Sequence, residues 1–247
     1  IKKSPKRWWL YAWALTVPFS IFLMFIQPVL IDPIYNDFSP LKDKALETKI
    51  LSLAEQADIP SEHVYEVNMS EKTNALNAYV TGIGDNSRIV LWDTTLNQLT
   101  DEEILFIMAH EIGHYVMKDV YIGIAEYLIM TLIGLWLIAK MMPWIIRRYG
   151  STLKIKQMSN IHSLPLFLLI SSFLLFFSSP LSNAVSRYQE VRADAYAMEL
   201  VEDPEAAVTS FQQLTKAGLG EVNPSLLVKW FRYSHPPMVE RIMNVKD

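Results

Sequence analysis

The sequence predicts a mainly α-helical membrane protein, in which transmembrane helices accompany a smaller α+β domain that contains a β-hairpin or small sheet. Three observations favour this class: three long apolar stretches, a hairpin pattern in the polar part of the chain, and a capped helix pattern directly after it. Hydrophobic residues make up 51% of the 247 residues. The mean hydropathy of +0.17 agrees with membrane-spanning segments.

Three stretches have the length and composition of membrane-spanning helices. They are Trp8–Leu30, Tyr121–Met142 and Ser163–Ser182, and only the second contains charged residues, Glu126 and Lys140. A helix needs about 20 apolar residues to cross the hydrocarbon core. The alternative, buried helices of a large soluble core, fits these lengths less well.

The three spans divide the chain into four segments. Residues 1–30 hold the N-terminal segment and the first span, and residues 31–120 form a polar block. Residues 121–182 form a transmembrane hairpin with a basic loop, and residues 183–247 form a second polar block.

The first polar block opens with helix and strand signals. Ser39 as N-cap and Pro40 as first helical residue predict a helix start. Residues His63–Val67 suit a short strand, and residues 74–92 predict a hairpin around a Gly/Asp/Asn turn.

A second helix should follow this hairpin and carry a metal-binding motif. Thr100 and Glu103 match a capping box, so the helix should include His110, Glu111 and His114. Two histidines four residues apart share one helix face and can bind one zinc ion, with the glutamate beside them as a base. The alternative is a surface helix with two solvated histidines.

A catalytic zinc ion needs a third protein ligand and one open position. No further histidine follows at a suitable spacing, and the better candidate is Glu190, on a predicted helix over residues 186–200. Asp194, four residues later, would orient a ligating histidine. Taken alone, Glu190 could equally be a solvated charge on that helix.

The number of membrane crossings favours Glu190 as the third ligand. Two spans lie between His114 and Glu190, so the chain returns to the side from which it left. His114 lies seven residues before one span, and Glu190 lies eight residues after the other. If both helices continue unbroken, each ligand stands about 10–12 Å outside the hydrocarbon boundary.

Composition excludes several other functions. The chain has no cysteine, which removes disulfides, thiolate metal sites and cysteine nucleophiles. The net charge of −4 and the absence of a basic-aromatic motif argue against nucleic acid as a partner.

These motifs together resemble the integral-membrane gluzincin metalloproteases, which include the CAAX prenyl endopeptidases and the heat-shock-induced membrane zinc protease. HEIGH and EVRAD resemble the metal set of the family, NAYVTG (77–82) its substrate strand, and SHPPMVERI (234–242) its C-terminal motif. IYNDFSPL and RWWL resemble the CAAX endopeptidase branch more closely. That branch has further spans upstream, so the chain resembles its C-terminal part.

The resemblance implies a zincin-like α+β catalytic domain, with zinc ligands His110, His114 and Glu190 and the base Glu111. It also implies that His235 donates a hydrogen bond to the reacting carbonyl oxygen, although a residue before two prolines is equally a helix-entry residue. Further residues that it suggests are Arg187 and Arg241 as braces of the site, and Asn77, Ala78, Tyr79 and Val80 as a strand that pairs with an extended substrate. Ordinary surface charges and an ordinary hairpin are the alternatives.

The function expected from these residues is that of a zinc metalloendopeptidase in the lipid bilayer, with one Zn²⁺ per chain. Its substrates would be peptides or membrane proteins cleaved near the bilayer surface, including C-terminally processed proteins. The alternatives are a non-catalytic zinc-containing scaffold or chaperone, and a heat-shock-type quality-control protease. A transporter is disfavoured because the polar chemistry lies outside the spans.

The sequence predicts neither the oligomeric state nor a unique membrane orientation. Basic residues before the first span and in the loop of the hairpin would place the polar blocks outside the cell. The family resemblance implies instead a cytoplasmic catalytic side, which we expect here.

Overall fold

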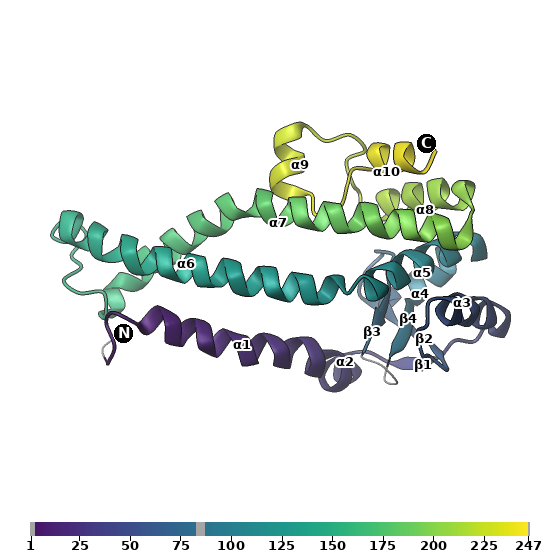
Figure 1. The fold of residues 1–247 in the computed structure, drawn as a ribbon, viewed down its shortest axis with the longest axis horizontal. Coiled ribbons are helices and arrows are strands. Elements are labelled where there is room, and N and C mark those ends of the chain that lie inside the picture. Colours follow the sequence, from purple (N-terminus) through teal and green to yellow (C-terminus); the bar gives the residue numbers. More distant parts are fainter. Residues whose placement is uncertain (1–2, 83–86, 247) are drawn as a thin grey trace. The chain divides into compact units, whose positions relative to one another are not determined.

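The computed structural model describes residues 3–82 and 87–246, and it is mainly helical with one four-stranded sheet (Figure 1). The chain forms two compact units. The helical unit comprises Ile1–Met24 and Tyr121–Ser182, and the sheet unit comprises Phe25–Val120 and Asn183–Asp247.

The helical unit contains α1 (Trp8–Ile26), most of α6 (Asp119–Tyr149) and the first part of α7 (Leu164–Val201), which follows a 3₁₀ turn at Ile161–Ser163. By length and composition, α6 and α7 can each cross a membrane. The first predicted span, Trp8–Leu30, begins with α1, which is also apolar but shorter than α6 and α7. After α1 the chain forms a π-helical turn (Gln27–Ile31) and α2 (Asp32–Tyr35).

The sheet has the strand order β1-β2-β4-β3. Its strands are β1 (Phe38–Pro40), β2 (Val64–Val67), β3 (Ala78–Thr81) and β4 (Arg88–Trp92). β2 and β4 are parallel, and the other two pairs are antiparallel. The predicted hairpin is therefore present as β3 and β4, while turn residues 83–86 lie outside the described part of the chain.

The predicted helix start at Ser39 and Pro40 is wrong. Both residues belong to β1 and pair with β2, and α3 (Lys44–Gln56) begins later. Its N-cap is Asp43, whose carboxylate accepts hydrogen bonds from the backbone N–H groups of Ala45 and Leu46 at 2.9 and 3.0 Å. An aspartate that reaches two free N–H groups is the stronger start signal.

The core of the sheet unit lies between the sheet and the helices α3, α5 (Asp101–Val116) and α8 (Pro204–Ala217). Phe106 on α5 meets Phe211 on α8 edge to face, with ring centroids 5.4 Å apart. The remaining elements are a 3₁₀ turn (Met69–Glu71), α4 (Asp93–Gln98), α9 (Leu226–Arg232) and α10 (Met238–Lys246).

The start and end of α5 differ in how well the sequence predicts them. The capping box is confirmed: Thr100 Oγ1 accepts from the N–H of Glu103, and the Glu103 carboxylate accepts from the N–H of Thr100. The condition that the helix continues unbroken from His114 into the next span is not met. α5 ends at Val116, Lys118 has a φ of 58°, and α6 starts at Asp119. α7, in contrast, continues unbroken through Glu190.

Candidate metal centre

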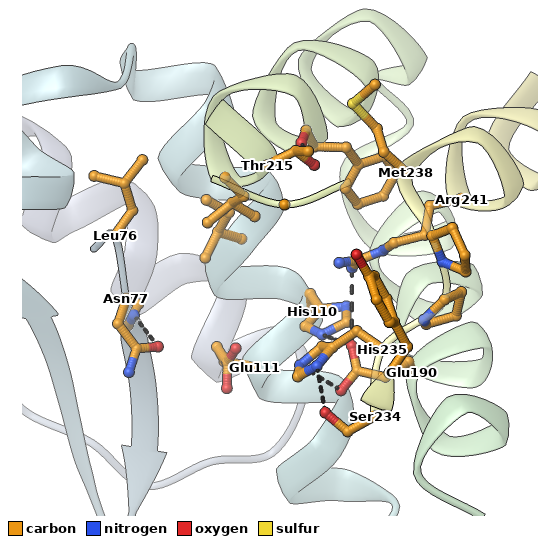
Figure 2. A pocket seen from close by; sticks show the side chains of 18 of the residues that line it. Leu76, Asn77, His110, Glu111, Glu190, Thr215, Ser234, His235, Met238 and Arg241 are labelled. Atoms are coloured by element: carbon orange, nitrogen blue, oxygen red, sulfur yellow. Dashed lines mark hydrogen bonds and ion pairs between the residues drawn. The ribbon is translucent and has the colours of Figure 1, made fainter. Parts of the chain in front are cut away.

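Three predicted metal ligands meet at the contact between α5 and α7. His110 and His114 lie one turn apart on α5. Glu190 comes from α7 and lies beside His110 (Figure 2). The two histidine Nε2 atoms are 3.1 Å apart. Each lies 3.4 Å from a Glu190 oxygen, Oε2 for His110 and Oε1 for His114.

These donor atoms fit a zinc ion. Bonds of 2.0–2.1 Å in tetrahedral geometry separate the donors by about 3.3–3.4 Å, close to the 3.1 and 3.4 Å observed. Glu190 Oε2 is buried and forms no hydrogen bond with any other described residue. A buried carboxylate oxygen without a donor is costly, and a bound cation would offset that cost.

Asp194 holds the first histidine, as the sequence predicts for a carboxylate four residues after Glu190. Its Oδ1 lies 2.8 Å from His110 Nδ1. Arg241 on α10 binds the same carboxylate in a bidentate manner, at 2.8 Å from Nε and 2.5 Å from Nη2. Burial opposes ionisation of Asp194, but His110 and Arg241 outweigh it and lower the pKa of Asp194 below its ordinary value.

A second carboxylate, which the sequence did not reveal, holds the other histidine. Asp119 is the buried first residue of α6, and its Oδ2 lies 2.8 Å from His114 Nδ1. In a continuous helix, a residue five positions after His114 would point about 140° away from it. The break after Val116 turns Asp119 back toward the histidine. An acidic residue directly after a helix end would have been the signal.

The histidines differ from free imidazoles in their acidity. Burial disfavours the charge on His110, but its contacts with Asp194 and Glu190 outweigh burial and raise the pKa of His110 to about 10. The pKa of His114 is also raised, because its contacts with Glu190 and Asp119 outweigh burial. The carboxylates therefore hold positive charge at this position, whether it is a proton or a metal ion.

Glu111 lies beside the three donors and lines the same cavity, whose volume is about 710 Å³. Burial raises the pKa of Glu111 above its ordinary value. A raised carboxyl pKa suits a group that takes up a proton and gives it back.

His235 approaches the site from the segment between α9 and α10. Its Nε2 lies 3.3 Å from Glu190 Oε1, and its Nδ1 lies 3.0 Å from Ser234 Oγ. The side chain is 62% exposed, so it also faces the cavity that it lines. This position suits a group that contacts substrate.

Arg187, which the sequence suggests as a brace of the metal site, binds backbone carbonyl groups near the end of α9. Its Nη1 donates to the carbonyl oxygens of Lys229 at 3.2 Å and Tyr233 at 2.7 Å. It therefore fixes the end of α9, directly before the segment that carries His235.

The predicted substrate strand is β3, which is an edge strand of the sheet. Asn77, Ala78 and Tyr79 line the cavity, whereas Val80 packs against the core instead. Burial raises the pKa of Tyr79 to about 12, so this side chain stays neutral. An edge strand beside a cavity can pair with an extended peptide.

Comparisons with known proteins agree with this geometry. Residues 40–247 match the family described as peptidase family M48, and residues 1–37 match the CAAX prenyl protease N-terminal region of five membrane helices. The chain is 61% identical over 246 residues to an uncharacterized metalloprotease, YhfN, of Bacillus subtilis (100% of this chain, 58% of the relative). It is 34% identical to a CAAX prenyl protease 1 homolog of Arabidopsis thaliana (96% and 55%).

A solved structure is also similar. The crystal structure of S. mikatae Ste24p superposes with a TM-score of 0.84 at 27% identity, covering 100% of this chain and 60% of that protein. The chain thus spans somewhat more than half the length of these relatives. The membrane-helix match and this structural similarity identify an integral membrane protein. Since the family match includes every donor of the candidate metal centre, the chain belongs to peptidase family M48.

Proposed function

We propose that this chain carries the zinc centre and the catalytic groups of a membrane-embedded zinc endopeptidase, with one Zn²⁺ per chain. The observation that carries this proposal is the meeting of His110, His114 and Glu190 at tetrahedral spacing, in a cavity that Glu111 also lines. Residues 31–120 and 183–247 would form its catalytic part, and residues 1–30 and 121–182 its membrane part.

Each residue has a distinct role in this proposal. Zinc, when bound, supplies a Lewis acid that activates water and polarises a peptide carbonyl. Glu111 takes the proton from the attacking water and passes it to the leaving amine. His235 donates a hydrogen bond to the carbonyl oxygen under attack, a contact that is typically worth about 3 kcal/mol of barrier. Asp194, supported by Arg241, keeps His110 in its ligating orientation.

The proposed substrate is an extended peptide at the surface of the lipid bilayer. It would pair with β3 and pass Asn77, Ala78 and Tyr79 toward the zinc donors. Relatives carry the name CAAX prenyl protease 1, so C-terminal peptides of prenylated proteins are the first substrates to test. We also propose that the catalytic part faces the cytoplasm.

The two alternatives predict other behaviour. A zinc-containing scaffold would need neither Glu111 nor an open cavity beside the ligands, and both are present. A quality-control protease of the heat-shock kind shares the chemistry and differs in substrate. It would cleave unfolded membrane proteins in preference to prenylated C-terminal peptides.

The experiment that tests the function compares the wild type with Glu111→Gln. We expect both proteins to hold zinc, and only the wild type to cleave a farnesylated C-terminal peptide or an unfolded membrane protein. The reduction should be about 100-fold or more, as for loss of a general base. Glu55→Gln, at an exposed position on α3, is the matched control and should retain activity. Full activity of Glu111→Gln would refute the mechanism.

A further inference from the structure

Helix α9 presents an apolar face that the sheet unit does not cover. The face consists of Leu226, Leu227 and Trp230, which are 66%, 73% and 50% exposed. Their spacing of three and four residues places them on one side of the helix. None of the seven residues of α9 is buried. Large apolar side chains that a fold leaves together in solvent usually contact something else.

Several polar contacts hold α9 in place. Asn183 Nδ2 donates to the carbonyl oxygen of Trp230 at 2.9 Å, and Arg187 binds two further carbonyls at the end of α9. Lys229 forms an ion pair with Glu240 of α10 at 2.5 Å. The helix thus lies beside α7 in a defined position (Figure 1), and its apolar face is exposed.

The attachment points on α7 fix the depth of α9 relative to the bilayer. Asn183 directly follows the predicted span Ser163–Ser182, and Arg187 lies five residues after that span. Because α7 is continuous, both attachments lie within about 8 Å of the end of the span, at 1.5 Å per residue. The headgroup region extends about 5–8 Å beyond each side of the hydrocarbon core.

The composition of α9 suits this depth. Tryptophan is enriched where membrane and water meet, and leucines flanked by cations are typical of helices that lie in this interface. Arg232, which is exposed, supplies such a cation, whereas Lys229 is paired with Glu240. We propose that the apolar face of α9 is seated in the headgroup–acyl boundary of the lipid bilayer.

The lipid contact would also affect how substrates reach the cavity. This second inference rests on the proposed function, but the lipid contact itself does not. α9 leads directly into Tyr233, Ser234 and His235, which line the cavity together with Arg232. One wall of the cavity is then anchored at the lipid surface. A substrate tethered to the bilayer would meet this wall without leaving the membrane.

A spin label on the face tests the lipid contact directly. The sequence contains no cysteine, so Leu227→Cys and Trp230→Cys each give one labelling site in it. The labelled protein is placed in nanodiscs of phosphatidylcholine and phosphatidylglycerol. Collisions with oxygen, which concentrates in lipid, and with a water-soluble nickel chelate are then measured by power saturation. We expect oxygen collisions to exceed nickel collisions several-fold at both sites.

The matched control is Ser52→Cys, an exposed polar position on α3, which should show the opposite ratio. Nickel collisions at Leu227→Cys equal to those at Ser52→Cys would mean that the face lies in water. Protection from both reagents would mean that protein covers it. Either result would overturn the proposal, and neither depends on whether the protein cleaves peptides.

Discussion

The two proposed zinc ligands His110 and His114 are each held by a carboxylate, but from different elements. Asp194 on α7 holds His110, and Asp119 at the start of α6 holds His114. Each carboxylate lies at Nδ1, so each ring presents Nε2 to the donor cluster. The tautomer of both rings is thus set by groups that do not touch the metal position.

We predict that Asp119→Asn weakens zinc binding by about 10–100-fold, the range typical of lost partners of metal-ligating histidines. The asparagine side chain carries no charge and can present its NH₂ group to Nδ1 in place of an oxygen. The tautomer of His114 is then no longer fixed. The measurement is competition for zinc with a chelator of known affinity. Asp93→Asn, which removes a carboxylate that accepts from Ser70 outside the cavity, is the control. An unchanged zinc affinity of Asp119→Asn would show that Asp119 has no positioning role.

The sequence predicts the donor residues better than the residues that hold them. His110 and His114 follow from a local motif, Glu190 follows from counting membrane crossings, and Asp194 follows from its position four residues after Glu190. Asp119 could not be recognised, because its orientation depends on a helix break that involves Lys118 at positive φ. Arg187 was recognised as a residue near the site, but only the structure shows that it binds the carbonyls of α9.

At the scale of elements, the approach of α5 to α7 determines the spacing of the donors. A Cβ atom on Gly113 would lie 3.2 Å from Tyr196 Cδ1 and 3.4 Å from Ala193 Cα. Glycine in a helix interior costs about 1 kcal/mol relative to alanine. Here it allows the two helices to come close enough for His110 Nε2 and Glu190 Oε2 to lie 3.4 Å apart.

We predict that Gly113→Ala lowers zinc affinity several-fold, although alanine favours the helix. The added methyl group pushes α5 away from α7, because it would press on Tyr196 Cδ1 and Cβ at 3.2 and 3.3 Å. Gly123→Ala on α6 gives the matched control, since its Cβ would meet nothing within 4 Å. Equal zinc affinities for the two variants would contradict this account of Gly113.

We predict that Thr100→Ala lowers the free energy of unfolding by about 1 kcal/mol, through loss of the N-cap of α5. Thr100→Ser keeps the hydroxyl oxygen and should retain most of the stability. Denaturant unfolding of the detergent-solubilised protein measures both. If Thr100→Ala and Thr100→Ser are equally stable, the capping box contributes nothing to α5.

The fold class was predictable because it rests on strong local signals. Apolar stretches predicted α6 and α7, a hairpin pattern around a Gly/Asp/Asn turn predicted β3 and β4, and the capping box predicted α5. The start of α3 was not predicted correctly, because Ser39 and Pro40 also match the pattern of a helix start. In the structure these two residues form part of β1 and pair with β2. The parallel pairing of β2 with β4 joins distant residues and has no local signal.

At the scale of the whole molecule, the charges and the family resemblance favour opposite orientations in the membrane. We predict a cytoplasmic position for the catalytic part. A reporter that is active only in the cytoplasm, fused after Asp247, should therefore be active. Its counterpart that is active only outside the cytoplasm, fused at the same residue, should be silent. The reverse pattern would show that the positive-inside signal of the basic loop determines the orientation.

The proposed metal centre holds its zinc ion with residues from both polar blocks of the chain. The most direct test is the zinc content of the purified protein, compared between the wild type and Glu190→Ala. We predict one zinc ion per wild-type chain, and well below one in Glu190→Ala after dialysis against a weak chelator. A wild type without zinc, or a Glu190→Ala variant that keeps a full equivalent, would contradict the metal centre described here.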